Sequence, residues 1–154
     1  MIVIAVSETS LDPAESLAAL EALGGGAVAS FTGVVRGEGG LTSLHLEHYP
    51  AMSAAEIDRI VAQARARWPL LGVVVRHRVG TLAPGERIVF VGTAARHRGP
   101  ALEACAFLID WLKTGAPFWK KERYADGREL WVEPRAEDAE SRGRWVGGGA
   151  RDAS

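Results

Sequence analysis

The sequence contains a single cysteine, Cys105, and therefore cannot form an intramolecular disulfide. Chains with so little cysteine are typical of reducing compartments, and we expect a cytoplasmic protein. No apolar run is long enough to cross a bilayer. The first residues, MIVIAVSE, also lack the basic region and the long apolar stretch of a secretory signal, so they are predicted to form a strand.

An excess of charge of one sign is also missing. The 154 residues include 18 basic and 19 acidic side chains, which give a formal net charge of −1. Such a chain does not attract nucleic acid or an anionic membrane through its overall field, so neither partner is expected. Any site for an anion must therefore be built locally. With 47% hydrophobic and 24% charged residues, the composition is typical of one globular domain.

Motifs for metal or phosphate binding are absent as well. No HxH or HExxH pattern occurs among the four histidines, and one cysteine cannot build a thiolate site. The glycine-rich segments 24–26 and 37–40 do not match the phosphate-binding pattern GxxxxGK[ST], and connecting loops explain them better. We therefore expect neither a metal nor a cofactor.

Cys105 is the first candidate nucleophile, but its surroundings in the sequence favour a different role. It lies at helical spacing from Leu102 and Ile109, which places it on the predicted apolar stripe of a helix. A buried cysteine behaves as a small hydrophobic residue and is chemically inert. We predict that Cys105 is part of the core.

The pattern of apolar residues and turn signals predicts an α+β fold. Helices are expected to start at Pro13 with Asp12 as N-cap, at the capping box Ser53-Ala-Ala-Glu56, and at Pro100. Strands are expected at 1–7, 27–35, 42–49, 73–79, 87–95, 118–124 and 129–133. The order β-α-β-β-α-β-β-α-β-β predicts a mainly antiparallel sheet covered by helices.

The same pattern suggests one domain followed by a tail. Residues 1–135 are predicted to form a single domain, with no linker or internal repeat inside it. Residues 136–154 are charged and then glycine-rich, and a segment of this kind is expected to be mobile unless Arg144 and Trp145 dock on the domain.

Two segments could carry chemistry. Arg96-His97-Arg98 lies between a strand and a helix start, where unpaired backbone N–H groups favour an anion, although a solvated basic loop explains it equally well. In LKTGAPFWKKE, Lys113 and Lys120 stand seven residues apart around Pro117. Lys113 could simply complement a helix dipole, and Lys120 could guard a sheet edge. If the chain turns at Pro117, however, both ammonium groups could converge on one pocket.

Several segments together resemble one known family, the large subunit of molybdopterin synthase. They follow in the family's order from about residue 27 to 135, and they read FTGVVRGEGG, LEHYPAMS, RHRVGTLAPGE, VFVGTAARHR, LKTGAPFWKKE and LWVEPR. Agreement of several motifs in order is more specific than any one motif. The resemblance implies an α+β fold described as hammerhead-like.

The resemblance also implies an activity and partners. Enzymes of this family are sulfurtransferases that convert the cyclic pterin phosphate called precursor Z into molybdopterin by building its dithiolene. The sulfur arrives as a thiocarboxylate on the C-terminal Gly-Gly of a small ubiquitin-like subunit. Two large subunits form a homodimer, which with two small subunits makes a heterotetramer. The chemistry requires proton transfers and stabilised negative charge, and lysines supply both.

Carried over by position, the resemblance assigns roles to particular residues. Lys113 and Lys120 are implied to be catalytic. The implied substrate-binding residues are Val34, Val35, Arg36, His97, Arg98, Lys113, Lys120, Lys121 and Glu122. Arg135 is implied as a contribution from the neighbouring subunit. One departure is visible, because Val34 stands where the family often has lysine, so a charge contact is lost there.

Two other functions compete with this one. The glycines near the C-terminus could suggest a sulfur carrier, but carriers end at Gly-Gly, whereas Ala150-Arg-Asp-Ala-Ser154 follows here. A non-catalytic α+β module that binds a phosphorylated metabolite or a partner protein would use the same arginines but would not need Lys113. Whether Lys113 forms a covalent bond to the partner, and in which order the two sulfurs are transferred, the sequence leaves open.

Overall fold

A computed structural model describes residues 1–115, 118–132, 143 and 145. The strands and helices follow in the order β1 (Ile2–Ser7), α1 (Pro13–Glu21), β2 (Ala27–Val34), β3 (Leu41–His48), α2 (Pro50–Arg67), β4 (Leu70–Arg78), β5 (Gly80–Leu82), β6 (Arg87–Ala95), α3 (Arg98–Gly115), β7 (Phe118–Tyr124) and β8 (Glu129–Val132). The predicted α+β class is confirmed. All seven predicted strands are present, and the short strand β5 was not predicted.

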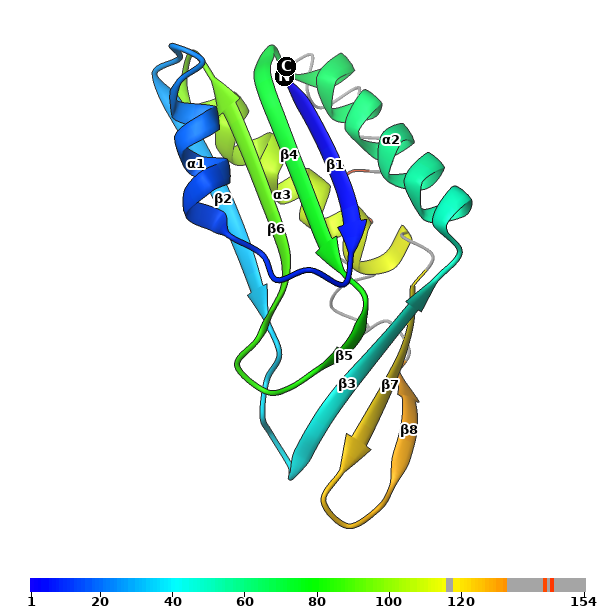
Figure 1. The fold of residues 1–154 in the computed structure, drawn as a ribbon. Helices are drawn as coiled ribbons and strands as arrows, with labels where there is room; N and C mark the ends of the chain where they lie inside the picture. The colour runs from blue at the N-terminus through cyan, green and yellow to red at the C-terminus, as the bar shows by residue number, and fades with distance from the viewer. Residues whose placement is uncertain (116–117, 133–142, 144, 146–154) are drawn as a thin grey trace.

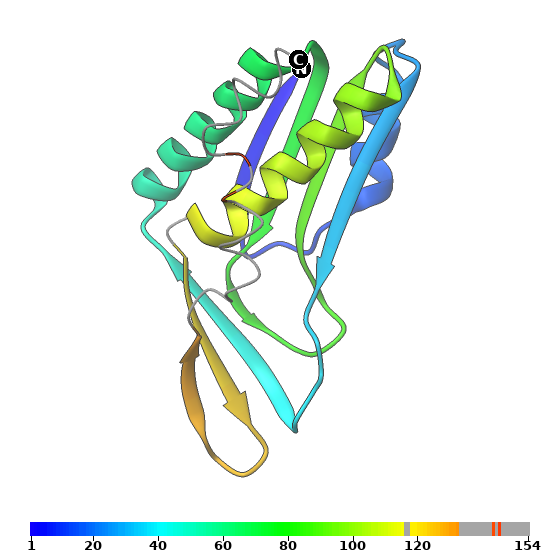
Figure 2. The same cartoon turned by 180° about the vertical axis from the view of Figure 1, so that it is seen from behind.

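The first sheet has the strand order β1-β4-β6-β2, in which β1 runs parallel to β4 and the other pairs are antiparallel. Helix α1 covers one face, and α2 and α3 cover the other (Figures 1 and 2). Because successive side chains of a strand point to opposite faces, Val73 and Val75 pack towards α2 and α3, whereas Val74 packs towards α1. Both faces of this sheet are therefore buried.

The helix starts follow local capping rules, with one difference from the prediction. The Asp12 carboxylate accepts a hydrogen bond from the backbone N–H of Ala14 at 3.1 Å, so the predicted cap of α1 is confirmed. Helix α2 begins at Pro50, three residues before the predicted capping box. A proline at the first helical position is already set for the helix. The Ser53 hydroxyl is therefore inside the helix, where it donates to the Pro50 carbonyl at 3.2 Å.

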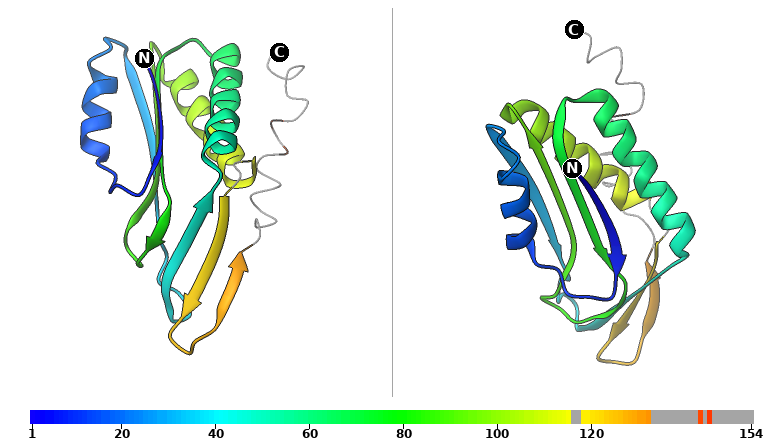
Figure 3. Two further views of the ribbon diagram at one scale, coloured as in Figure 1. Left: turned by 45° about the vertical axis from the view of Figure 1, so that its right-hand side comes forward. Right: turned by 45° about the horizontal axis from the view of Figure 1, so that its top comes forward.

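The second sheet has the order β5-β3-β7-β8 and extends beyond the lower end of the first sheet (Figure 3). Two residues connect the cores of the two sheets. Val6 and Phe118 each pack against the core between the first sheet and α2–α3, and also against the smaller core beside β3 and β5. The point where the sheets meet is therefore fixed by apolar contacts.

Helix α3 also differs in part from its predicted orientation. The predicted stripe included Leu102, but this side chain is 60% exposed, whereas Phe107 is fully buried. Cys105 is buried as predicted, and its thiol donates a weak hydrogen bond to the Val91 carbonyl at 3.8 Å. Burial raises the pKa of this thiol to about 11, so the reactive thiolate is not available near neutral pH.

Part of the predicted tail can be placed. The Trp145 ring packs edge-on against Trp68 and Phe107, and its Nε1 donates to the Asp110 carboxylate at 2.6 Å. Pro117, Arg135 and the rest of the segment 136–154, Gly143 apart, lie outside the described residues. Across the described part of the chain, no helix has the length and apolar character needed to cross a membrane.

Candidate active site

A cavity of about 310 Å³ lies where the two sheets and the end of α3 meet. Its walls come from the end of β2 and the residues after it, from β3, β4, β6 and β7, from the last turns of α3, and from β8. The lining residues are Val34, Val35, Arg36, Leu41, Leu44, His77, Ile88, Val89, Ile109, Leu112, Lys113, Thr114, Phe118, Lys120, Glu122 and Val132. Most of them are apolar, and the charged groups are few.

An irregularity in the first sheet shapes one wall of the cavity. The register of β2 against β6 shifts between Gly33 and Val34, so that Gly33 pairs with Val89 and Val34 pairs with Arg87. Ile88 is left without an opposite residue and lines the cavity. A side chain at position 33 would not fit, because its Cβ would lie 2.7 Å from a methyl group of Val89. Such bulges re-aim side chains beside functional sites.

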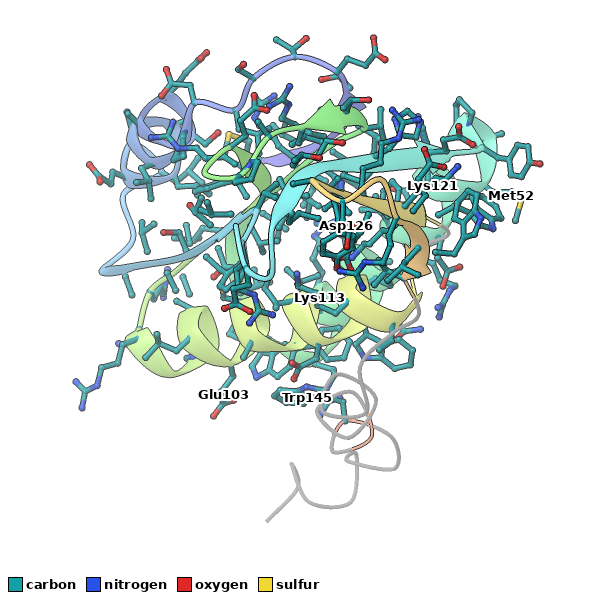
Figure 4. All side chains as sticks on the ribbon, turned by 90° about the horizontal axis from the view of Figure 1, so that it is seen from below. Met52, Glu103, Lys113, Lys121, Asp126 and Trp145 are labelled. Atoms are coloured by element: carbon teal, nitrogen blue, oxygen red, sulfur yellow. The ribbon has the colours of Figure 1, made fainter. Side chains whose placement is uncertain are left out.

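Lys113 and Lys120 line the same cavity, as their spacing around Pro117 predicted. Lys113 lies in the last turn of α3, where a cation is favoured by the helix dipole, and Lys120 lies on β7. In Figure 4, Lys113 is on the side of α3 that faces the strands, whereas Glu103 and Trp145 are on its other side. The two lysines therefore reach the cavity from different elements.

Lys120 and Lys121 are neighbours in sequence but serve different faces of β7. Lys121 does not line the cavity and instead forms an ion pair with Glu129 across the β7–β8 hairpin, with 2.7 Å between Nζ and Oε2. Its ammonium group also lies 5.5 Å from the centre of the Trp131 ring. The alternation of a strand explains the difference, because successive side chains point to opposite faces. Within one chain Lys121 therefore lies outside the cavity wall, whereas the resemblance implied that it contacts substrate.

Glu122 is the acidic residue of the cavity wall, as its position two residues after Lys120 requires. Its carboxylate accepts a hydrogen bond from the hydroxyl of Tyr124 at 2.5 Å. This hydrogen bond holds Glu122 in place on β7. The partner Tyr124 was not identified in the sequence, although the predicted strand 118–124 places it on the same face as Glu122.

Arg36 joins the lysines, but the His97-Arg98 pair does not. Val34, Val35 and Arg36 follow one another along the cavity wall, and the substrate contacts implied for them stay a prediction. Arg98 is the first residue of α3 and Lys113 lies in its last turn, so they are separated by about 22 Å along the helix axis. His97 and Arg98 are both exposed. The helix thus prevents these two residues from reaching the cavity of their own chain.

His77 is a cavity residue that the motif analysis missed. Its side chain is 6% exposed, and its Nδ1 lies 2.7 Å from the backbone carbonyl of Arg78. Burial, together with the nearby charges of Lys120 and Lys113, lowers the pKa of His77 to about 4, although the hydrogen bond to the Arg78 carbonyl opposes this shift. The imidazole is therefore neutral near pH 7. The available signal was the alternation Val73, Val75, His77, which places a polar ring on an apolar face.

The charge distribution of the cavity suits an anionic ligand. Among the described lining residues, the cations are Arg36, Lys113 and Lys120, and Glu122 is the carboxylate. Arginine binds phosphate oxygens through two parallel hydrogen bonds, and lysines stabilise developing negative charge or transfer protons. The arrangement therefore suits an anionic ligand, such as a phosphate ester, that reacts close to two lysines.

Comparisons with known proteins agree with this description. Residues 6–115 match the family model described as MoaE protein. A molybdopterin synthase catalytic subunit from Brucella melitensis is 54% identical over 122 residues, which cover 78% of this chain and 75% of that protein. The solved structure of a molybdopterin biosynthesis MoaE protein from Burkholderia ambifaria has a TM-score of 0.81 at 43% identity, with 95% of this chain and 99% of that chain covered.

A further solved structure contains two different subunits. It is a complex of subunits 1 and 2 of the molybdopterin-converting factor from Helicobacter pylori. The matching chain has a TM-score of 0.69 at 26% identity, with 87% of this chain and 91% of that chain covered.

Proposed function

Because the chain belongs to the MoaE protein family, whose members are the catalytic subunits of molybdopterin synthase, we propose that its cavity binds precursor Z beside Lys113 and Lys120. Membership of this family makes the chain a sulfurtransferase of molybdenum cofactor biosynthesis, which acts with a small sulfur-carrier subunit. The observation that carries the proposed site is the meeting of Arg36, Lys113 and Lys120 around one cavity.

Each charged group has a role in this proposal. Arg36 binds the cyclic phosphate of the substrate, because a guanidinium group matches two phosphate oxygens. Lys113 and Lys120 transfer protons and stabilise negative charge while the thiocarboxylate sulfur attacks and substrate oxygen leaves. Glu122, held by Tyr124, contributes to the substrate pocket. The Gly-Gly tail of the small subunit enters the same cavity, because its terminal sulfur must reach the substrate carbon.

A reconstitution assay tests the proposal. The protein is mixed with a thiocarboxylated small subunit and precursor Z, and molybdopterin is measured for the wild type, Lys113→Ala and Lys121→Ala. Lys121 is a matched control because it lies in the same segment but outside the cavity wall. We expect product from the wild type and Lys121→Ala, and none from Lys113→Ala. Binding of the small subunit without product in any of them would instead favour the non-catalytic module.

His97 and Arg98 enter the proposal through a second copy of the chain. Since α3 keeps them about 22 Å from Lys113 in one protomer, they can bind substrate only in the cavity of a partner protomer. A homodimer that brings the start of α3 to the neighbour's cavity would complete the phosphate site. Arg135, which follows β8 in the sequence, belongs to the same proposed contribution.

Mixed dimers distinguish this arrangement from a site confined to one chain. In this proposal the Lys113→Ala and Arg98→Ala homodimers are each inactive. A mixed dimer has one intact site, in which Lys113 comes from one chain and Arg98 from the other. After subunit exchange of equal amounts, activity should return to roughly a quarter of the wild-type value, because half of the dimers are mixed. No recovery, with exchange shown by mass spectrometry, would mean that Arg98 and Lys113 act within the same chain, and the shared site would be wrong.

The cytoplasm is the proposed place of the reaction. It is supported by the composition, since the only cysteine is a free, buried thiol. Cell fractionation with an antibody against the protein would test this assignment.

A further inference from the structure

His77 lies at the junction of the two sheets, and none of the proposed catalytic steps uses it. It is close to the end of the central strand β4, where it pairs with Val6 of β1 and Val89 of β6. A position between two paired strands leaves its backbone little freedom. The side chain lines the cavity together with Lys113 and Lys120.

Two contacts fix the orientation of the His77 ring. The Nδ1 atom lies 2.7 Å from the carbonyl oxygen of Arg78, and since a carbonyl only accepts, Nδ1 carries the proton. One face of the ring is stacked on Phe118, with ring centres 4.1 Å apart and an angle of 17° between the planes. The hydrogen bond restricts rotation of the imidazole, and the same ring face therefore stays in contact with Phe118.

Phe118 transmits this orientation to the reactive part of the cavity. It is the first residue of β7, and it shares a face of that strand with Lys120 and Glu122, because side chains at i, i+2 and i+4 point the same way. All three line the cavity. Phe118 also packs against the cores of both sheets. The packing of the Phe118 ring therefore fixes the start of β7, and with it the position from which the Lys120 side chain extends into the cavity.

The electrostatics of the site favour a neutral ring at this point. The charges of Lys113 and Lys120 act on the imidazole, as does His48, whose ring centre is 6.0 Å from that of Phe118. A protonated imidazole at His77 would add a further cation to a buried site that already has two lysines. A neutral aromatic ring stacks on Phe118 and adds no positive charge beside the two lysines.

We propose that His77 is a positioning residue of this site, whose ring face holds Phe118 and thereby directs Lys120 into the cavity. The proposal rests on the proposed function, which makes Lys120 a catalytic residue. The position of the Lys120 side chain can nevertheless be measured without an activity assay. A histidine that merely fills the core would be replaceable by any apolar side chain of similar volume.

Two variants separate these roles. His77→Phe keeps a neutral ring face against Phe118 and loses only the hydrogen bond to the Arg78 carbonyl, whereas His77→Leu loses both contacts. We expect the turnover number of His77→Leu to fall by about tenfold or more, because a displacement of about 1 Å in a catalytic group has large effects on rate. The Michaelis constant for the small subunit should change little, and His77→Phe should stay within about threefold of the wild type. His45→Leu, on β3 outside this cavity, is the control.

Lysine NMR provides a readout that does not depend on product formation. The chain contains only three lysines, Lys113, Lys120 and Lys121, so a sample labelled at lysine gives three side-chain signals. We expect the Lys120 signal to move in His77→Leu but not in His77→Phe. Lys121, paired with Glu129 outside the cavity, should not move in either variant and is the internal reference.

The outcomes are distinguishable from a failure of the proposed function. If the wild type makes no molybdopterin, the proposed function is wrong, and the lysine signals still decide the role of His77. If His77→Leu and His77→Phe have the same turnover number and the same Lys120 signal, the positioning role is wrong, whether both resemble the wild type or both are impaired. Circular dichroism confirms that the compared variants are folded.

Discussion

The two sheets of this protein differ in how they meet solvent and in what they contribute. The first sheet is covered by helices on both faces, and its central strands carry fully buried side chains such as Val73 and Phe90. The second sheet is more open, with Trp119 42% exposed and Trp131 60% exposed. Yet the second sheet supplies Lys120 and Glu122. The core of the first sheet thus provides stability, whereas the second sheet provides reactive groups that meet Lys113 from the end of α3.

The largest expected effect is on activity and comes from the second sheet. Lys120→Ala removes a proposed proton-transfer group, so we expect the turnover number to fall by roughly 10²- to 10⁴-fold. The midpoint of thermal unfolding should hardly change, because Lys120 is not part of a core. Steady-state kinetics and calorimetry on one preparation test both statements. A loss of activity matched by an equal loss of folded protein would mean that Lys120 contributes to stability, which contradicts the different roles of the two sheets.

The opposite effect is expected in the first sheet. Phe90 on β6 is 1% exposed and belongs to the core under α1, so Phe90→Ala should lower the free energy of unfolding by about 3–5 kcal/mol. The turnover number per folded molecule should stay near the wild-type value. Chemical denaturation measures the first quantity and active-site titration the second. Trp131→Ala, at an exposed site of the second sheet, is the comparison and should change stability by less than about 0.5 kcal/mol.

The junction between the sheets should respond to pH through His77. Its pKa is about 4 in the folded protein against an ordinary value of 6.5, so between these values the unfolded chain binds more protons. The free energy of unfolding should therefore decrease as the pH falls from 6.5 to 4, and the contribution of His77 is about 3 kcal/mol. Above pH 6.5 this stability is fully present.

Denaturation curves at several pH values, for the wild type and for His77→Phe, measure this contribution. The difference between the two proteins isolates His77, because the carboxyl groups titrate in both. The phenylalanine variant should lose less stability than the wild type on acidification. Parallel pH dependences would mean that the ring of His77 is accessible to protons in the folded state.

The smallest of these effects is on stability and concerns the N-terminal cap of α1, the helix on one face of the first sheet. Asp12→Ala removes the acceptor for the backbone N–H of Ala14 and should lower the free energy of unfolding by about 1 kcal/mol. Asp12→Asn, which keeps an acceptor, should retain most of the stability. Activity should be the same in all three proteins. An effect on turnover would show that α1 is coupled to the cavity.

Much of the fold follows from local signals in the sequence, and the errors have physical causes. The strand 118–124 and the cap at Asp12 were predicted as observed, because alternation and capping act over a few residues. The strand β5 was missed because three residues give no period, and it exists only by pairing with β3. The exposure of Leu102 was not predicted either, because the sheet and α2 together decide which side of α3 is covered.

The site was predictable to a similar extent. The shared cavity of Lys113 and Lys120 followed from their spacing, and Arg36 followed from the family motif. The distance between Arg98 and Lys113 could have been derived from the length of α3 alone. A further signal was overlooked: the chain has 15 arginines but three lysines, and all three lie between residues 113 and 121. The stacking of His77 on Phe118 required coordinates, because the two residues are 41 positions apart in the sequence and lie on strands of different sheets.

The pairing pattern of the strands has a consequence for how the chain folds. Among the described strands, β1 pairs with β4, β2 with β6, and β3 with β5 and β7, so none of the first three pairs with its neighbour in sequence. During synthesis, about 70 residues must emerge from the ribosome before the first of these strands meets a partner. Folds dominated by such distant contacts form in milliseconds to seconds rather than microseconds. The nascent chain therefore exposes unpaired strands for longer than a helical protein of this size, and protection by chaperones should matter most during that interval.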